Sequence, residues 1–149
     1  MARHAASVLG AAHLRTDEIR KELFAKPTYS EEEKKAVYEE MFWQAKETIK
    51  HQPLVLDATF LRASGRQKAL ALAEAAGSPW LILETICSEE IARQRLAARK
   101  NDASDAGYTQ YLELKKFWEP IAEPHFQIDT AGDYQKKLED ILNKKAAHG

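Results

Sequence analysis

The sequence has one cysteine, Cys87, and its longest apolar run spans only residues 69–73. A single cysteine excludes a disulfide framework and a multi-cysteine zinc site. So short an apolar run falls well below the ~20 residues that a membrane-spanning helix needs. Neither sign of charge is in clear excess, because 22 Lys and Arg nearly balance 23 Asp and Glu, for a formal net charge of −1. This balance gives no sign of a general polyanion binder, which would carry a basic excess.

The chain is 149 residues long, with 44% hydrophobic and 30% charged residues. This length suits one domain, and the composition is that of ordinary globular proteins. The apolar stretch at the start is broken by Gly10 and His13, so it does not resemble a signal peptide. We therefore expect a single intracellular domain over residues 1–149, located in the cytoplasm and with no membrane partner.

Short apolar runs alternate with helical patterns, without an internal repeat. Strands are predicted at residues 11–15, 52–57, 80–87 and 126–129. The first predicted helix opens near Asp17 and contains Arg20. A second follows a capping box of Ser30 and Glu33. Further helices are predicted over 64–76 and 88–100, around 108–115, and after Gly132. The alternation predicts right-handed βαβ units in an α/β fold, a doubly wound parallel sheet with helices on both faces.

Acidic residues lie where the predicted strands end, at the edge where such sheets bind ligands. Asp17 and Arg20 are three residues apart and therefore share one helix face. They suit a carboxylate base beside a guanidinium that holds a substrate, or a first-turn acid with a weak ion pair. Asp57 ends the second strand, where it either holds Mg²⁺ through water or simply terminates the strand.

Arg95 and Arg99 are four residues apart near the end of a predicted helix. They suit a lid that neutralises charge on a phosphoryl group in transfer, or a solvated helix face. The five histidines show no metal-ligand spacing. No Ser–His–Asp arrangement for nucleophilic catalysis can be argued from the sequence.

Four segments, in order along the chain, match those of one family. Residues 14–23, L-R-T-D-E-I-R-K-E-L, match R-S-D-x-x-R-K-x-L, and residues 54–61, L-V-L-D-A-T-F-L, followed by Arg66, match V-x-L-D-A-T-F-L…R. Residues 95–106 match the family's lid and residues 128–130 its last strand. The chain thus resembles the P-loop kinases described as predicted kinases or AAA-type ATPases, relatives of zeta toxins and polynucleotide 5′-hydroxyl kinases.

The resemblance implies transfer of the γ-phosphoryl group of ATP to a hydroxyl, with Mg²⁺ as cofactor. It implies that Asp17 is the catalytic base and that Arg95 and Arg99 are catalytic lid arginines. Asp57 would be the metal-binding acid near Mg²⁺. The remaining assignments by resemblance are substrate binding by Arg20, Thr59 and Arg66, and nucleotide binding by Asp129 and Thr130.

One motif of that family has no counterpart in the sequence. P-loop kinases begin with a strand and the Walker A loop G-x-x-x-x-G-K-S/T, whose backbone N–H groups and lysine cradle the phosphates. None of the six glycines here are five residues apart, and none precedes Lys-Ser or Lys-Thr. Residues 2–11 look like the end of the helix that follows this loop. We therefore expect the first strand and the phosphate loop to be missing, which makes the domain N-terminally incomplete.

In the family's strand order, the missing strand lies at the centre of the sheet, between the strands near residues 54 and 80. Each unpaired buried backbone group costs about 1–3 kcal/mol. The chain is therefore expected to pair these two strands directly, to borrow a strand from a partner, or to be marginally stable. Self-association through the unpaired strands is the expected consequence.

The predicted function is ATP-dependent phosphotransfer, impaired in this chain because phosphoryl transfer depends on positioning the phosphates. The alternatives are a non-catalytic binding or interaction module and a truncated kinase remnant, so the sequence leaves open whether the chain is an enzyme. Net charge near zero favours a small-molecule acceptor over a nucleic acid, whose phosphate backbone calls for a basic groove.

Overall fold

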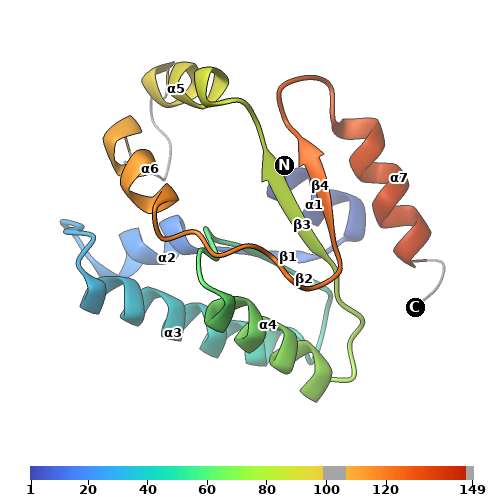
Figure 1. Ribbon diagram of the computed structural model, residues 1–149. Coiled ribbons are helices and arrows are strands. Elements are labelled where there is room, and N and C mark those ends of the chain that lie inside the picture. The colour runs from blue at the N-terminus through green and yellow to red at the C-terminus, as the bar shows by residue number, and fades with distance from the viewer. Residues whose placement is uncertain (99–106, 147–149) are drawn as a thin grey trace.

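The computed structural model describes residues 1–98 and 107–146. It contains four short strands at the predicted runs (Figure 1): β1 (Ala12–Arg15), β2 (Leu54–Asp57), β3 (Ile82–Ile86) and β4 (His125–Asp129). The predicted site residue Arg99 and the loop segment 102–106 lie outside the described residues.

The described strands form two separate two-stranded parallel sheets. β1 pairs with β2 in a register that puts Arg15 opposite Asp57, and β3 pairs with β4 in a register that puts Ile86 opposite Asp129. β2 and β3 are not hydrogen-bonded to each other within the described residues. The sequence left three outcomes open for these strands: direct pairing, a strand borrowed from a partner, or marginal stability. The structure does not show direct pairing of β2 with β3.

Seven helices are described, and they alternate with the strands as the sequence predicts. They are α1 (Ala2–Leu9), α2 (Thr16–Leu23), α3 (Glu31–Thr48), α4 (Ala63–Ala75), α5 (Glu89–Ala98), α6 (Tyr108–Lys115) and α7 (Gln135–Ala146). Ser30 caps α3 as predicted, because its hydroxyl accepts a hydrogen bond from the backbone N–H of Glu33 at 3.2 Å. α1 ends at Gly10, whose positive φ of 58° suits glycine at a helix C-terminus.

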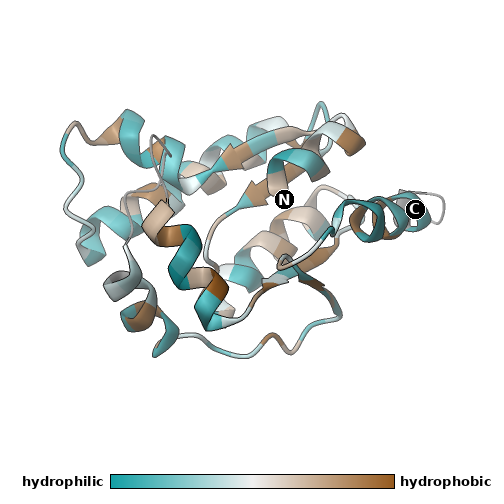
Figure 2. Cartoon of the chain, turned by 90° about the horizontal axis from the view of Figure 1, so that it is seen from above, coloured by the Kyte–Doolittle hydropathy of each residue, from teal (hydrophilic) through white to brown (hydrophobic). Residues whose placement is uncertain are grey.

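Each sheet has its own hydrophobic cluster. Ile19 of α2 packs with Val37 and Met41 of α3 against the β1–β2 sheet. In the second cluster, Ile128 of β4 packs with Leu138 and Leu142 of α7 and with Ala5 of α1. Figure 2 shows hydrophobic colour along the strands and a mixture of hydrophobic and hydrophilic turns along the helices, as expected when one helix face covers a sheet.

α1 links the two halves of the fold. It packs against β1 and β2 and also against α7, which lies beside β4 in Figure 1. α3 contacts β1 and β2 as well.

The mixed α/β fold with parallel strands and covering helices confirms the predicted fold class. None of the helices among the described residues is long and apolar enough to span a membrane.

Candidate active site

The carboxylates of Asp17 and Asp57 lie on either side of Arg15, at the carboxyl ends of β1 and β2. Arg15 Nη2 is 3.6 Å from Asp17 Oδ2, and Arg15 Nε is 3.7 Å from Asp57 Oδ2. His13 Nε2 lies 3.2 Å from the same Asp57 oxygen. The side chains of Asp17 and Asp57 are 27% and 37% exposed, so both can be reached from solvent. We call these two residues the acidic pair.

Local structure explains how the acidic pair is assembled. Parallel pairing brings the ends of β1 and β2 together, with Arg15 opposite Asp57. α2 begins directly after β1, at Thr16, whose hydroxyl donates to the backbone carbonyl of Asp57 at 3.4 Å. Asp17 therefore lies in the first turn of α2, where the helix dipole favours a negative charge.

Each carboxylate of the acidic pair is chemically suited to bind Mg²⁺ in a nucleotide site. No cluster of three or more His, Cys, Asp or Glu side chains that could hold a metal occurs in the described part of the chain. Mg²⁺ in such sites is commonly held by one or two carboxylates together with substrate phosphates and water, rather than by an all-protein cage. Two accessible carboxylates meet this requirement, whereas the 149 residues contain no Walker A sequence to cradle the phosphates.

A second group of predicted residues meets where α5 lies over the end of β4. Arg95 Nη1 donates to the hydroxyl of Thr130 at 2.8 Å, and Nη2 donates to the Thr130 carbonyl. The Thr130 hydroxyl is also 3.2 Å from the carbonyl of Ile86, to which it donates. Asp129 Oδ1 accepts from the backbone N–H of Ala131 at 2.8 Å. The structure thus joins a predicted lid arginine to a predicted nucleotide-binding residue.

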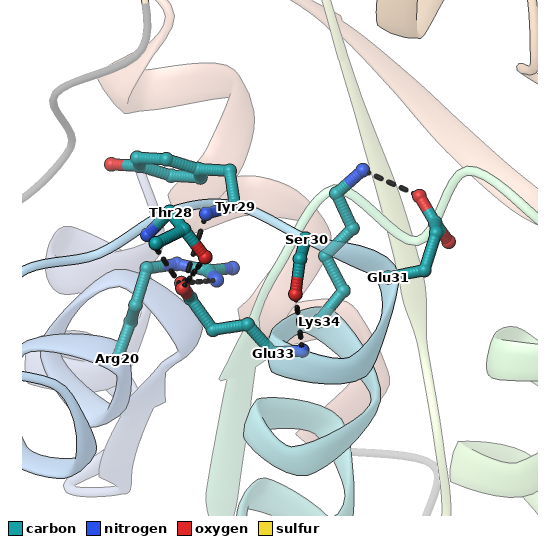
Figure 3. Close-up of polar contacts among 7 residues, drawn as sticks. All are labelled: Arg20, Thr28, Tyr29, Ser30, Glu31, Glu33 and Lys34. Atoms are coloured by element: carbon teal, nitrogen blue, oxygen red, sulfur yellow. Dashed lines mark hydrogen bonds and ion pairs between the residues drawn. The ribbon is translucent and has the colours of Figure 1, made fainter.

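Arg20 does not lie in the open edge with Asp17 but in a buried ion pair with Glu33 (Figure 3). Arg20 is 7% exposed and Glu33 4%, and Arg20 Nη1 donates to Glu33 Oε1 at 2.6 Å. Glu33 Oε2 accepts from the backbone N–H and hydroxyl of Thr28, at 2.6 and 2.9 Å, and from the backbone N–H of Tyr29 at 3.1 Å. The Tyr29 ring lies 4.7 Å from the Arg20 guanidinium. This placement does not support direct contact between Arg20 and a substrate.

These contacts set the ionisation of Glu33. Burial alone would raise the pKa of its carboxyl, but the hydrogen bonds from Arg20, Thr28 and Tyr29 outweigh burial and lower the pKa to about 2. Hydrogen bonds to the charged form of a carboxylate have this effect because protonation would remove them.

Acid is therefore expected to remove the contribution of Glu33 to stability. The lowered pKa means that this contribution is present above the ordinary carboxyl value of 4.5 and is lost as the pH falls towards about 2. The free energy of unfolding of the native chain should thus exceed that of Glu33→Gln near neutral pH, with the gap shrinking between these two pH values. Urea denaturation across this range measures it, with Glu32→Gln, an exposed neighbour, as the control. A gap that stays constant with pH would contradict the prediction.

The other two predicted substrate-binding residues lie near the loop that follows β2. Arg66 is 4% exposed and donates to the backbone carbonyls of Phe60 and Pro120, at 2.9 and 2.8 Å. These contacts favour a structural role, in which Arg66 joins the loop after β2 to the segment before β4. The Thr59 hydroxyl is exposed and lies 3.4 Å from the hydroxyl of Tyr38, so it remains accessible at the site.

Sequence reasoning missed three residues of this region. Arg15 and His13 both contact Asp57. They are two residues apart in β1 and therefore lie on the same face of the sheet, which is the signal that could have grouped them. Glu33 was interpreted only as part of a capping box, and no local signal pointed to Arg20 as its partner.

Two solved structures share the fold of this chain. A gluconokinase from Sinorhizobium meliloti 1021 matches with a TM-score of 0.69 at 16% identity, over 99% of this chain and 85% of that one. The tunicamycin resistance protein of Deinococcus radiodurans matches with a TM-score of 0.57 at 14% identity, over 97% of this chain and 90% of that one. The chain therefore shares its fold with these two proteins.

The family follows from the sequence itself. The sequence profile described as the AAA domain matches residues 1–121, most of the chain. The chain belongs to this AAA domain family, which confirms the resemblance inferred from the motifs. The search against curated proteins returned no significant match.

Proposed function

We propose that the protein is an ATP-dependent phosphotransferase that moves the γ-phosphoryl group to a hydroxyl of a small-molecule acceptor. The observation that carries the proposal is the acidic pair, two accessible carboxylates at neighbouring strand ends of a P-loop kinase-type fold. This pairing suits one carboxylate near the metal and one beside the attacking hydroxyl. A near-neutral net charge favours a small acceptor over a polynucleotide. The composition with its single cysteine suits the cytoplasm, which we include in the proposal.

In the proposed reaction, the acceptor oxygen forms a bond to the γ-phosphorus while the bond from that phosphorus to the β–γ bridging oxygen breaks, and ADP leaves. Asp17 accepts the proton of the attacking hydroxyl. Asp57 would hold Mg²⁺, which supplies neutralisation of charge on the phosphoryl oxygens. Arg95 of α5 would contribute positive charge, as would Arg99, while Asp129 and Thr130 lie on the proposed nucleotide side. Thr59 is an accessible hydroxyl for acceptor binding.

Titration calorimetry with ATP at millimolar Mg²⁺ tests the nucleotide site. We expect binding tighter than ~1 mM that is lost in Asp57→Asn, because the carboxylate that would hold Mg²⁺ becomes a neutral amide. Asp140→Asn, an exposed aspartate on α7, is the matched control and should bind like the native chain. No heat at any ATP concentration would contradict the proposal and favour the alternative, a non-catalytic interaction module or a kinase remnant.

The acceptor is tested by transfer of label from γ-labelled ATP. Gluconate and tunicamycin are the first candidates, because the two similar structures are a gluconokinase and a tunicamycin resistance protein. Labelled product from one of them, absent without Mg²⁺, would identify the acceptor class.

Self-association is part of the proposal. β2 and β3 each have one neighbour in the described strand pairing, and an open strand edge is a template for pairing with another chain. Sedimentation velocity over a concentration series is expected to show species larger than a monomer that grow with concentration. A monodisperse monomer with one cooperative melt would contradict this expectation.

A further inference from the structure

The Arg20–Glu33 pair is connected to the acidic pair through one short helix. Asp17 and Arg20 both belong to α2, which has 8 residues. Isolated helices of this length are not stable in water, so tertiary contacts decide where α2 lies. At its start, the Thr16 hydroxyl donates to the carbonyl of Asp57. One turn later, Arg20 is bound to Glu33 of α3.

We propose that Glu33 is a positioning residue of the phosphotransfer site: through Arg20 it holds α2 so that the Asp17 carboxylate stays beside Arg15, which also contacts Asp57. Glu33 is itself too deeply buried to contact an acceptor. The inference rests on the proposed function, since it requires Asp17 to act as the base.

The physical reason lies in the buried charge of Arg20. Its Nε already has no hydrogen-bond partner among the described residues, so the bond from Nη1 to Glu33 carries much of the compensation for burying the guanidinium. Without the Glu33 carboxylate, the guanidinium gains by moving towards water and takes the second half of α2 with it. A displacement of about 1 Å at a reacting group can cost about a hundredfold in rate.

The loop after α2 depends on the same carboxylate. Tyr29 has a positive φ of 59°, a conformation that a non-glycine residue keeps when its surroundings hold it. Here the backbone N–H of Tyr29 donates to Glu33 and its ring covers the Arg20 guanidinium. Figure 3 shows Arg20, Thr28 and Tyr29 converging on the Glu33 carboxylate from α2 and from the loop. One side chain thus holds both the helix that carries Asp17 and the loop that follows it.

The experiment separates positioning from stability with the double variant Arg20→Met/Glu33→Met. Replacing a buried ion pair by apolar side chains of similar size often preserves stability, so the stability cost in this variant comes chiefly from Thr28 and Tyr29, whose donors lose the Glu33 acceptor. Glu33→Gln leaves Arg20 without its anionic partner, and Glu32→Gln is the exposed control on the same helix turn. Single-turnover transfer from γ-labelled ATP to gluconate is measured at a temperature where circular dichroism shows every variant folded.

We expect the double variant, folded at the assay temperature, to transfer label about a hundredfold more slowly, with an unchanged half-saturating ATP concentration. A purely structural role predicts instead native rates at any temperature where the variant is folded. Native rates in the double variant would overturn the inference. Should that variant not fold, Glu33→Gln takes its place at a temperature where it is folded, because it removes the anionic partner of Arg20, and native rates there would overturn the inference equally. If the native chain transfers label to neither gluconate nor tunicamycin, the proposed function fails and the inference with it, and the missing native rate distinguishes this outcome from a slow variant.

Discussion

Asp17→Asn is expected to slow phosphotransfer by about 10²–10⁴-fold, the range that a general base contributes. The amide keeps the size and position of the carboxylate in the first turn of α2 but cannot accept the proton of the attacking hydroxyl. Binding of ATP with Mg²⁺ should change little if Asp57 rather than Asp17 holds the metal. Single-turnover transfer and titration calorimetry on the same preparation therefore separate the roles of the two carboxylates.

The control for this experiment is Glu18→Gln on the same helix. Glu18 is the next residue along α2, and its side chain is 47% exposed beside Arg3. It loses a negative charge in the same helix turn without touching the acidic pair. Equal losses of rate in Asp17→Asn and Glu18→Gln would show that the helix charge, and not a base at position 17, governs transfer.

Met41→Ala is expected to lower the free energy of unfolding by about 2–5 kcal/mol. Met41 is fully buried between α3 and the β1–β2 sheet, in the cluster with Ile19 and Val37. Truncation removes apolar contacts and leaves a cavity, which both destabilise the fold. Because Ile19 of α2 packs in this cluster, the variant should also weaken the packing of α2, the helix that carries Asp17.

Trp43→Ala is the matched control for the core variant. Trp43 lies two residues further along α3 but is 64% exposed, and exposed substitutions usually change stability by about 0.5 kcal/mol or less. Urea denaturation of the two variants beside the native chain measures both effects. A loss in Met41→Ala no larger than that in Trp43→Ala would contradict the packing described for the first cluster.

Local patterns were sufficient to predict the elements of this fold. The apolar runs coincide with β1 to β4, and Ser30 caps α3 through the N–H of Glu33 as expected. The location of Asp17 and Asp57 at one edge of the sheet was also predictable, because Asp57 ends β2, Asp17 closely follows β1, and parallel strands end at the same edge. These properties depend on neighbours in the chain or on the direction of the strands, both of which the sequence encodes directly.

Contacts between distant segments were not predictable in the same way. Arg20 and Arg66 both belong to motifs that imply substrate binding, yet both guanidiniums are buried and bound to groups of their own chain. Their partners, Glu33 and the carbonyls of Phe60 and Pro120, are specified by the paths of loops rather than by any periodicity. The sequence around Glu33 indicates a capping box whether or not the folded chain brings Arg20 into contact with it.

The sequence by itself determined the order of strands and helices, the helix caps and the acidic residues at the strand ends, because each of these follows from hydrogen bonding and side-chain periodicity over a few residues. Tertiary structure alone decided that the strands form two sheets, that Arg20 pairs with Glu33 and that Arg15 lies between Asp17 and Asp57. Those outcomes depend on which charged side chains and strand edges come into contact in the folded chain. The free energy of each ion pair depends on how deeply its charges are buried.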